Sequence, residues 1–195
     1  MWFARHNDKE AKTLIDLIMT MTFAPDVPAI LVATLNTDQR NHILTTIEKE
    51  REINDAFARR MTQLEAKGFG VKNLENLQGD ECDIVILSVG YGRTPEGKFK
   101  KLYGPINQKH GYRLLNVLVT RARHKMFVLN SIPMEETRMF LHEMGAGGSS
   151  WSRGLFHAYL NYARLISLEK REEALHVLDQ IRQFNLEHRD QHVSS

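Results

Sequence analysis

The chain has 195 residues, of which 42% are apolar and 26% are charged, so it can form one globular domain with a small appendage. Its longest apolar runs are only strand-sized, and its single cysteine, Cys82, has no internal disulfide partner. These features exclude a membrane-spanning segment and a disulfide scaffold. Because the start of the chain also lacks the apolar run of a signal peptide, we expect a cytoplasmic protein.

The formal net charge is only +2, but the basic residues are concentrated in one part of the chain. Residues 84–134 hold nine Lys and Arg residues against one acid, Glu96, whereas the other residues hold 17 basic and 23 acidic side chains. Such a basic segment suits a phosphate-rich partner, which could be a nucleotide or a nucleic acid. A solvated basic loop would have the same composition.

Predicted strands alternate with predicted helices along the first three quarters of the chain. Apolar spacing predicts helices over residues 7–23, 36–51, 56–67 and 112–123, and strands over residues 29–35, 71–74, 83–89 and 125–132. A glycine-rich, basic excursion at 90–111 separates the third strand from the fourth helix. This alternation is typical of an α/β domain with a mostly parallel sheet flanked by helices.

A linker is predicted at residues 145–150, whose sequence is Gly-Ala-Gly-Gly-Ser-Ser. It divides the chain into a domain at 1–144 and a C-terminal helical extension at 145–195. Two amphipathic helices are predicted in the extension, over 151–166 and 169–184. We expect their apolar stripes to be packing surfaces, namely Leu155, Tyr159, Tyr162 and Ile166 on the first and Leu175, Leu178 and Ile181 on the second.

Residues 92–99 nearly match the phosphate-binding loop G-x-x-x-x-G-K-[ST]. Phe99 occupies the place of the hydroxyl residue that would bind Mg²⁺. A helix should also begin there, yet the following sequence is typical of a loop. We therefore reject this segment as a phosphate loop.

Three polar segments border the predicted strands. Arg40 follows the first strand, where ligands of parallel sheets commonly bind. Gln78, Gly79 and Glu81 precede the third strand, in a turn where glycine permits close backbone approach. Arg121 lies toward the end of the fourth helix. Two guanidinium groups at one phosphate would stabilise the charge that develops in phosphoryl transfer, and a carboxylate suits a ribose hydroxyl.

These segments resemble motifs IV, V and VI of superfamily 1 nucleic-acid helicases, most closely the Upf-like, Dna/Nam-type branch that includes large bacterial helicases. Residues 113–123 match the core of motif VI, and residues 78–89 match motif V, Q-G-x-E-x-D followed by an apolar strand. The similarity covers residues 7–132. It implies a second, C-terminal RecA-like motor domain with a P-loop NTPase-type fold.

The resemblance also implies a role for each matching residue. Arg40 and Arg121 correspond to catalytic arginines that reach the γ-phosphate of ATP. Nucleotide-binding positions fall on Gln39, Gln78, Gly79 and Glu81, and positions that contact single-stranded nucleic acid fall on Thr34, Asn73, Glu75, Asn76 and Arg113. Two non-catalytic alternatives stay open: Arg40 could be a solvated arginine on a helix, and Arg121 could form a structural ion pair.

The implied cofactor is ATP with Mg²⁺, whose metal ligands we expect in the first RecA-like domain of the same parent chain. The implied partner is single-stranded nucleic acid; the motifs do not distinguish DNA from RNA, although DNA is favoured. Without a phosphate loop, this chain is expected to be inactive by itself. A non-catalytic nucleic-acid-binding or regulatory module is the alternative. Two departures from the motif VI pattern are Leu114, where a second arginine is common, and Leu118, where alanine is usual.

Overall fold

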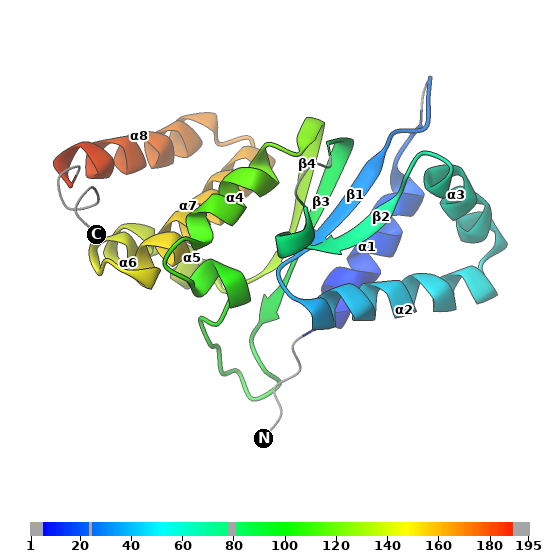
Figure 1. Ribbon diagram of the computed structural model, residues 1–195, viewed down its shortest axis with the longest axis horizontal. Helices are drawn as coiled ribbons and strands as arrows, with labels where there is room; N and C mark the ends of the chain where they lie inside the picture. The colour runs from blue at the N-terminus through cyan, green and yellow to red at the C-terminus, as the bar shows by residue number, and fades with distance from the viewer. Residues whose placement is uncertain (1–5, 24, 78–80, 189–195) are drawn as a thin grey trace. The chain divides into compact units, whose positions relative to one another are not determined.

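The computed structural model describes residues 6–23, 25–77 and 81–188, and it divides the chain into two compact units (Figure 1). Unit 1 comprises residues 1–105 and 113–131, and unit 2 comprises residues 106–112 and 132–195. This division differs from the predicted one after residue 144, because two unpredicted short helices pack with the helices that follow them. They are α5 (Met134–Arg138) and α6 (Phe140–Gly145).

Unit 1 contains a four-stranded sheet in which every neighbouring pair is parallel. The strand order is β2-β1-β3-β4, with bounds Ile30–Thr34 for β1, Gly70–Asn73 for β2, Cys82–Gly92 for β3 and Ala122–Ser131 for β4. In the register, Val32 of β1 lies between Val71 of β2 and Ile86 of β3. The parallel sheet confirms the predicted α/β, RecA-like fold class.

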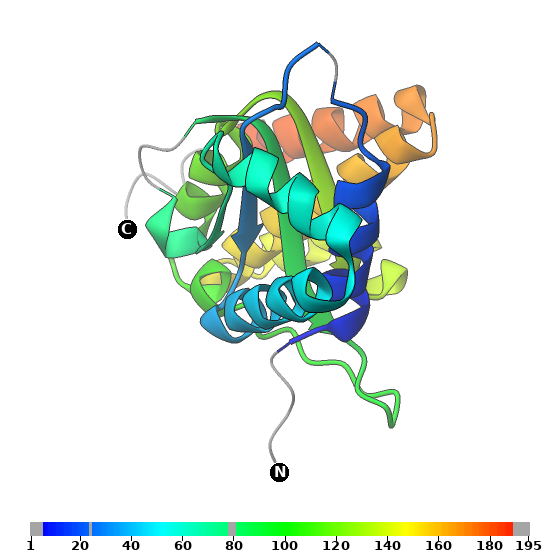
Figure 2. The same cartoon turned by 90° about the vertical axis from the view of Figure 1, so that its right-hand side faces the viewer.

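Helices cover both faces of this sheet. They are α1 (Asp8–Thr20), α2 (Thr37–Ile53), α3 (Asp55–Glu65) and α4 (Gly111–Val119). From β1 the chain passes through α2 and α3 to β2 on one side, and from β3 it passes through α4 to β4 on the other. Because such crossovers are right-handed, their helices lie on opposite faces. Figure 2 shows α1, α2 and α3 together in front of one face.

Asparagine side chains fix the starts of the three helices on that face. Asn7, Asn36 and Asn54 each accept a hydrogen bond from the backbone N–H three residues later. The predicted apolar stripe of α1 is confirmed, since Leu14 and Ile18 are fully buried. They pack with residues of the other helices and of the sheet in one continuous core.

The predicted helix over 112–123 is too long. Helix α4 ends at Val119, and Ala122 already belongs to β4. The cause is pairing with β3, because the backbone N–H of Cys82 donates to the carbonyl of Arg121 at 3.0 Å. Helical periodicity in the sequence cannot predict this hydrogen bond between two strands.

Unit 2 is helical, with α7 (Ser149–Ser167) and α8 (Arg171–Glu187) following α5 and α6. The predicted linker shrinks to residues 146–148. The predicted apolar stripes are confirmed only in part. Tyr162 of α7 and Ile181 of α8 pack against the core of unit 2, whereas Leu175 and Leu178 of α8 are 58% and 43% exposed. The buried face of α7 instead contains Gly154, where an added Cβ would lie only 2.6 Å from Met144 Cγ. Close helix approach therefore selects the packed face, rather than the largest apolar side chains.

No helix among the described residues is both long and apolar enough to cross a bilayer.

Candidate functional site

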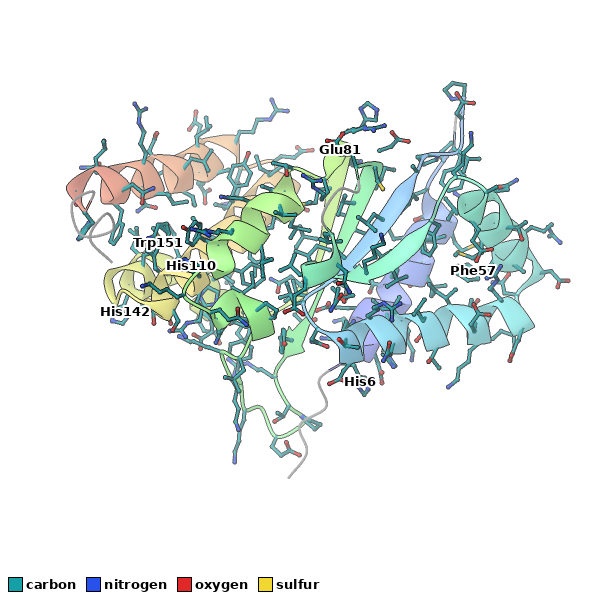
Figure 3. The ribbon with its side chains drawn as sticks, viewed as in Figure 1. His6, Phe57, Glu81, His110, His142 and Trp151 are labelled. Atoms are coloured by element: carbon teal, nitrogen blue, oxygen red, sulfur yellow. The ribbon has the colours of Figure 1, made fainter. Side chains whose placement is uncertain are left out.

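The predicted site residues of unit 1 lie at two opposite edges of the sheet. Thr34 ends β1 and Asn73 ends β2, so Arg40, in the first turns of α2, lies at the carboxyl edge. Glu81 precedes β3 and Arg121 precedes β4, at the amino edge; Figure 3 labels Glu81 there. A β-strand rises about 3.3 Å per residue, so the five residues of β1 separate the two edges of the sheet. The structure therefore does not bring Arg40 and Arg121 together around one phosphate.

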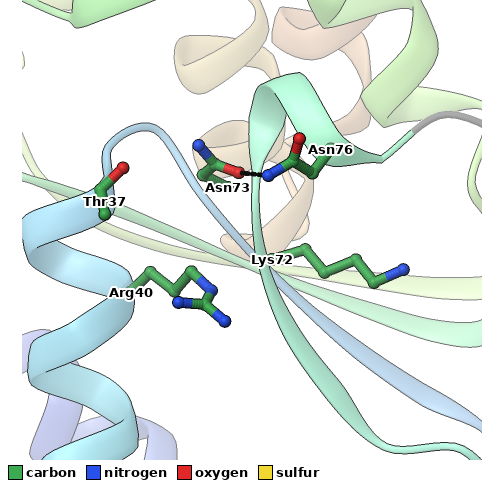
Figure 4. A pocket seen from close by; sticks show the side chains of 5 residues that line it. All are labelled: Thr37, Arg40, Lys72, Asn73 and Asn76. Carbon is green, nitrogen blue, oxygen red and sulfur yellow. Dashed lines mark hydrogen bonds between the residues drawn. The ribbon is translucent and has the colours of Figure 1, made fainter.

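A cleft of about 360 Å³ opens at the carboxyl edge, and we call it the carboxyl-edge cleft (Figure 4). Its lining residues come from the start of α2, from β2 and from the turn after β2, namely Thr37, Arg40, Lys72, Asn73 and Asn76. Arg40 Nε donates to the carbonyl of Val71 at 3.0 Å, which holds the guanidinium group against β2. Two cations beside the amino terminus of a helix make a surface suited to anions.

Of the residues predicted to contact single-stranded nucleic acid, Asn73 and Asn76 line the cleft. The Nδ2 of Asn76 donates to the Oδ1 of Asn73. Thr34 is fully buried, and its hydroxyl donates to the carbonyl of Asn36 at 3.0 Å. The Thr34 hydroxyl is therefore engaged inside the domain, and its contact with a nucleic-acid strand stays a prediction. Glu75 is exposed but anionic, which opposes phosphate binding.

For three further residues, the position relative to the cleft differs from the prediction. Arg113 is exposed on α4, which covers the sheet face opposite α2, so it lies outside the cleft. Thr37 and Lys72 line the cleft without having been predicted. The signal for Lys72 was present in the sequence, because a lone cation follows Val71 in a short strand and precedes a polar turn.

At the amino edge, Glu81, Arg121 and Arg123 form what we call the amino-edge cluster. Arg123 Nε lies 3.5 Å from Glu81 Oε2, and both side chains are more than half exposed. Arg121 Nε donates to the carbonyl of Val117 at 2.9 Å, and its Nη2 donates to Thr120 Oγ1 at 3.0 Å. Gln78 and Gly79, predicted to bind nucleotide beside Glu81, lie outside the described residues.

Gln39, also predicted to bind nucleotide, is instead part of a buried polar network. It is fully buried, and its Nε2 donates to Ser88 Oγ at 2.8 Å. Ser88 Oγ in turn donates to Glu10 Oε2 at 2.8 Å, and the backbone N–H of Gly90 donates to the same oxygen at 2.8 Å. The side chain of Gln39 is therefore engaged inside the domain, and its nucleotide-binding role stays a prediction. We refer to Glu10, Gln39, Ser88 and Gly90 as the Glu10 network.

The segment at 92–99 forms a turn, in which the N–H of Thr94 donates to the carbonyl of Lys98 at 2.7 Å. No helix begins at Phe99, in agreement with the rejection of this segment as a phosphate loop.

Comparison with known proteins places this fold in a family. Residues 3–132, two thirds of the chain, match the model of a family described as AAA domain. The chain belongs to the AAA domain family.

Two curated relatives resemble almost the whole chain. The chain is 30% identical over 176 residues to the uncharacterized ATP-dependent helicase MG140 of Mycoplasma genitalium. The matched region covers 89% of this chain and 15% of that protein. The chain is 31% identical over 170 residues to the MG140 homolog of Mycoplasma pneumoniae, which covers 86% of this chain and 14% of that protein. The chain thus spans only about 15% of the curated relatives it matches.

Within this AAA domain, the Glu10 network joins α1 and α2 to the carboxyl ends of β3 and β4. Burial raises the pKa of Glu10, while hydrogen bonds from Gly90, Ser88 and Ser131 act in the opposite direction. Two signals for this network were present in the sequence and missed: an acid on the apolar face of α1, and a serine within the apolar run at 84–89 of β3.

The Glu10 network requires glycine at position 90, because a Cβ atom there would collide with Gln39. The φ of Gly90 is +78°, and an added Cβ would lie 3.0 Å from Gln39 Cγ. We expect Gly90→Ala to lower the free energy of unfolding by about 1–3 kcal/mol, through strained backbone and displaced Gln39. Gly97 has the same φ of +78° but no atom within 4 Å of an added Cβ.

Gly97→Ala is therefore the matched control, because it carries the backbone strain alone. Urea unfolding of the two variants separates the contributions. Equal losses would show that the contact with Gln39 contributes nothing.

Proposed function

We propose that this chain is the second, C-terminal motor domain of an ATP-dependent superfamily 1 helicase of the Upf-like, Dna/Nam-type branch. The observation that carries the proposal is the placement of two phosphate-suited groups of residues at opposite edges of one parallel sheet. In this proposal the amino-edge cluster meets ATP, and the carboxyl-edge cleft holds a single strand. Both curated relatives are named ATP-dependent helicases, which supports the proposal.

The amino-edge cluster fits the outer part of a nucleotide. A guanidinium group at Arg121 can donate to phosphate oxygens through a planar fork, and the Glu81 carboxylate can accept from a ribose hydroxyl. Within the described residues, the hydrogen bonds of the Arg121 guanidinium go to Val117 and Thr120, which are neutral acceptors. Because a charge-assisted bond is roughly twice as strong as a neutral one, phosphate would draw this side chain outward. ATP and its Mg²⁺ would be held mainly by a first RecA-like domain.

The carboxyl-edge cleft fits a nucleic-acid backbone. Arg40 and Lys72 supply two cations, and the amides of Asn73 and Asn76 supply further donors within the same cleft. Contacts of this kind hold a phosphate backbone without reading its sequence. In this proposal Arg40 therefore serves the strand rather than the γ-phosphate, which revises the role that the resemblance implied.

Single-strand binding by this chain tests the cleft. We expect the double variant Arg40→Gln, Lys72→Gln to bind a labelled oligothymidylate about tenfold or more weakly at low salt. Each cation lost should also reduce the slope of log affinity against log salt by about 0.7. Fluorescence anisotropy across a salt series measures both quantities, and an oligouridylate gives the matching RNA result.

The control is the double variant Arg59→Gln, Lys67→Gln, which removes the same charge from two exposed positions outside the cleft. It should bind nearly as the unmodified chain does. Equal weakening in both double variants would mean that net charge, and not the cleft, attracts the strand.

A further inference from the structure

Two histidines and one aspartate converge on one point of unit 1. His6 precedes α1, Asp8 is the first residue of α1, and His42 lies in the second turn of α2. The Nε2 of His42 lies 2.7 Å from Asp8 Oδ1, and the Nε2 of His6 lies 3.7 Å from the same oxygen. One potential ligand atom from each residue lies within 4.8 Å of the other two. Figure 3 labels His6 beside the start of α2.

A simple ion pair does not require this arrangement, because one histidine satisfies one carboxylate oxygen. Here both imidazole rings direct the same kind of nitrogen toward one oxygen, and the rings are stacked with centroids 4.3 Å apart. Two stacked imidazolium ions would repel each other. The neutral imidazole is the form that binds a metal ion.

We propose that His6, Asp8 and His42 form a Zn²⁺ site with water as the fourth ligand. Two imidazole nitrogens and one carboxylate oxygen are a donor set typical of zinc with an open position. Mg²⁺ and Ca²⁺ prefer oxygen ligands alone, so these ions should not compete. The site is separate from both the carboxyl-edge cleft and the amino-edge cluster.

The three ligand atoms, which lie within 4.8 Å of one another, must adjust to the spacing of a tetrahedral zinc site. Zinc bonds of about 2.0–2.2 Å place tetrahedral ligand atoms roughly 3.3–3.5 Å apart. The His6–Asp8 distance of 3.7 Å is close to this value, and the His42–Asp8 distance of 2.7 Å must open slightly. The Asp8 side chain is 70% exposed and can move, whereas His42, at 25%, is held more firmly. Bound metal would tie the segment before α1 to α2, the helix that carries Arg40.

Calorimetric titration of the 195-residue chain with Zn²⁺ tests the proposal. We expect one equivalent to bind at neutral pH, and no binding of Mg²⁺ under the same conditions. His42→Ala and Asp8→Asn should each weaken zinc binding at least about tenfold. Circular dichroism without metal shows whether each variant is folded; because Asp8 is exposed, Asp8→Asn keeps the test valid if His42→Ala unfolds.

Three control variants each remove another potential zinc ligand. His142→Ala removes an exposed histidine of α6, His188→Ala removes the one that stacks on Phe184, and Cys82→Ser removes the thiol. Each should bind zinc as the unmodified chain does. Absence of zinc binding, or binding that is lost in a control and retained in His42→Ala and Asp8→Asn, would overturn the proposal.

Discussion

If the proposed helicase function holds, replacing Arg121 with alanine in the full-length protein is expected to lower the turnover number for ATP by about 10³-fold or more, the usual size of an arginine-finger effect. The guanidinium group would stabilise charge that develops on the transferred phosphoryl group. Nucleotide affinity should change much less, because a first RecA-like domain would supply most contacts in the ground state. Arg121→Lys should restore little activity, since an ammonium group cannot reproduce the planar fork.

The measurement is steady-state ATP hydrolysis in saturating single strand, together with a nucleotide-binding titration. Arg59→Ala, at an exposed position of α3, is the matched control and should retain normal turnover. Arg40→Ala should raise the strand concentration needed for half-maximal activity while leaving the saturated rate close to normal. Near-normal turnover of Arg121→Ala would instead mean that Arg121 is a structural residue and not an arginine finger.

The fold of unit 1 was predictable because its signals are local. Buried strands such as β3 are apolar on both faces, and helix α1 has its apolar residues at helical spacing with Asn7 as its cap. Strand pairing is not local. The end of α4 was therefore misplaced, because Arg121 is drawn into the ladder beside Cys82. Helix packing in unit 2 was missed for the same reason, since Gly154 matters only beside Met144.

For the candidate site, the resemblance to helicase motifs assigned Arg40 and Arg121 to one phosphate, although their positions in the sequence relative to the strands indicate otherwise. Arg40 follows a strand and Arg121 precedes one, which places them at opposite edges of the parallel sheet. Burial was also not predicted for Gln39, which follows the N-cap of α2 beside Arg40, yet its side chain points into the core. Patterns of residue type identified polar segments correctly, but not the direction of each side chain.

Replacing Glu10 with alanine is expected to lower the free energy of unfolding by about 2–4 kcal/mol. The carboxylate accepts from the backbone N–H of Gly90 and from the Ser88 hydroxyl, and both lie in the protein interior. Each buried group left without a partner costs about 1–3 kcal/mol, and the lost side chain adds a cavity. Relief from burying a charge offsets part of this loss. Urea unfolding followed by circular dichroism measures the change, and Lys12→Ala, at an exposed position of α1, is the control.

The same side chain predicts a pH dependence, and its sign follows from burial. Because burial raises the folded-state pKa of Glu10 above the ordinary value of 4.5, the folded chain holds this proton more tightly than the unfolded chain does. The contribution of Glu10 is therefore largest below pH 4.5 and decreases as pH rises through the folded-state pKa. Glu10→Gln cannot titrate, so the stability of the unmodified chain minus that of Glu10→Gln should fall over this window and then level off. Since the groups around Glu10, namely Asn7, Ser88, Gly90 and Ser131, are uncharged, other titrations should cancel in the difference. A difference that grows with rising pH would mean that the hydrogen bonds to the carboxylate outweigh its burial.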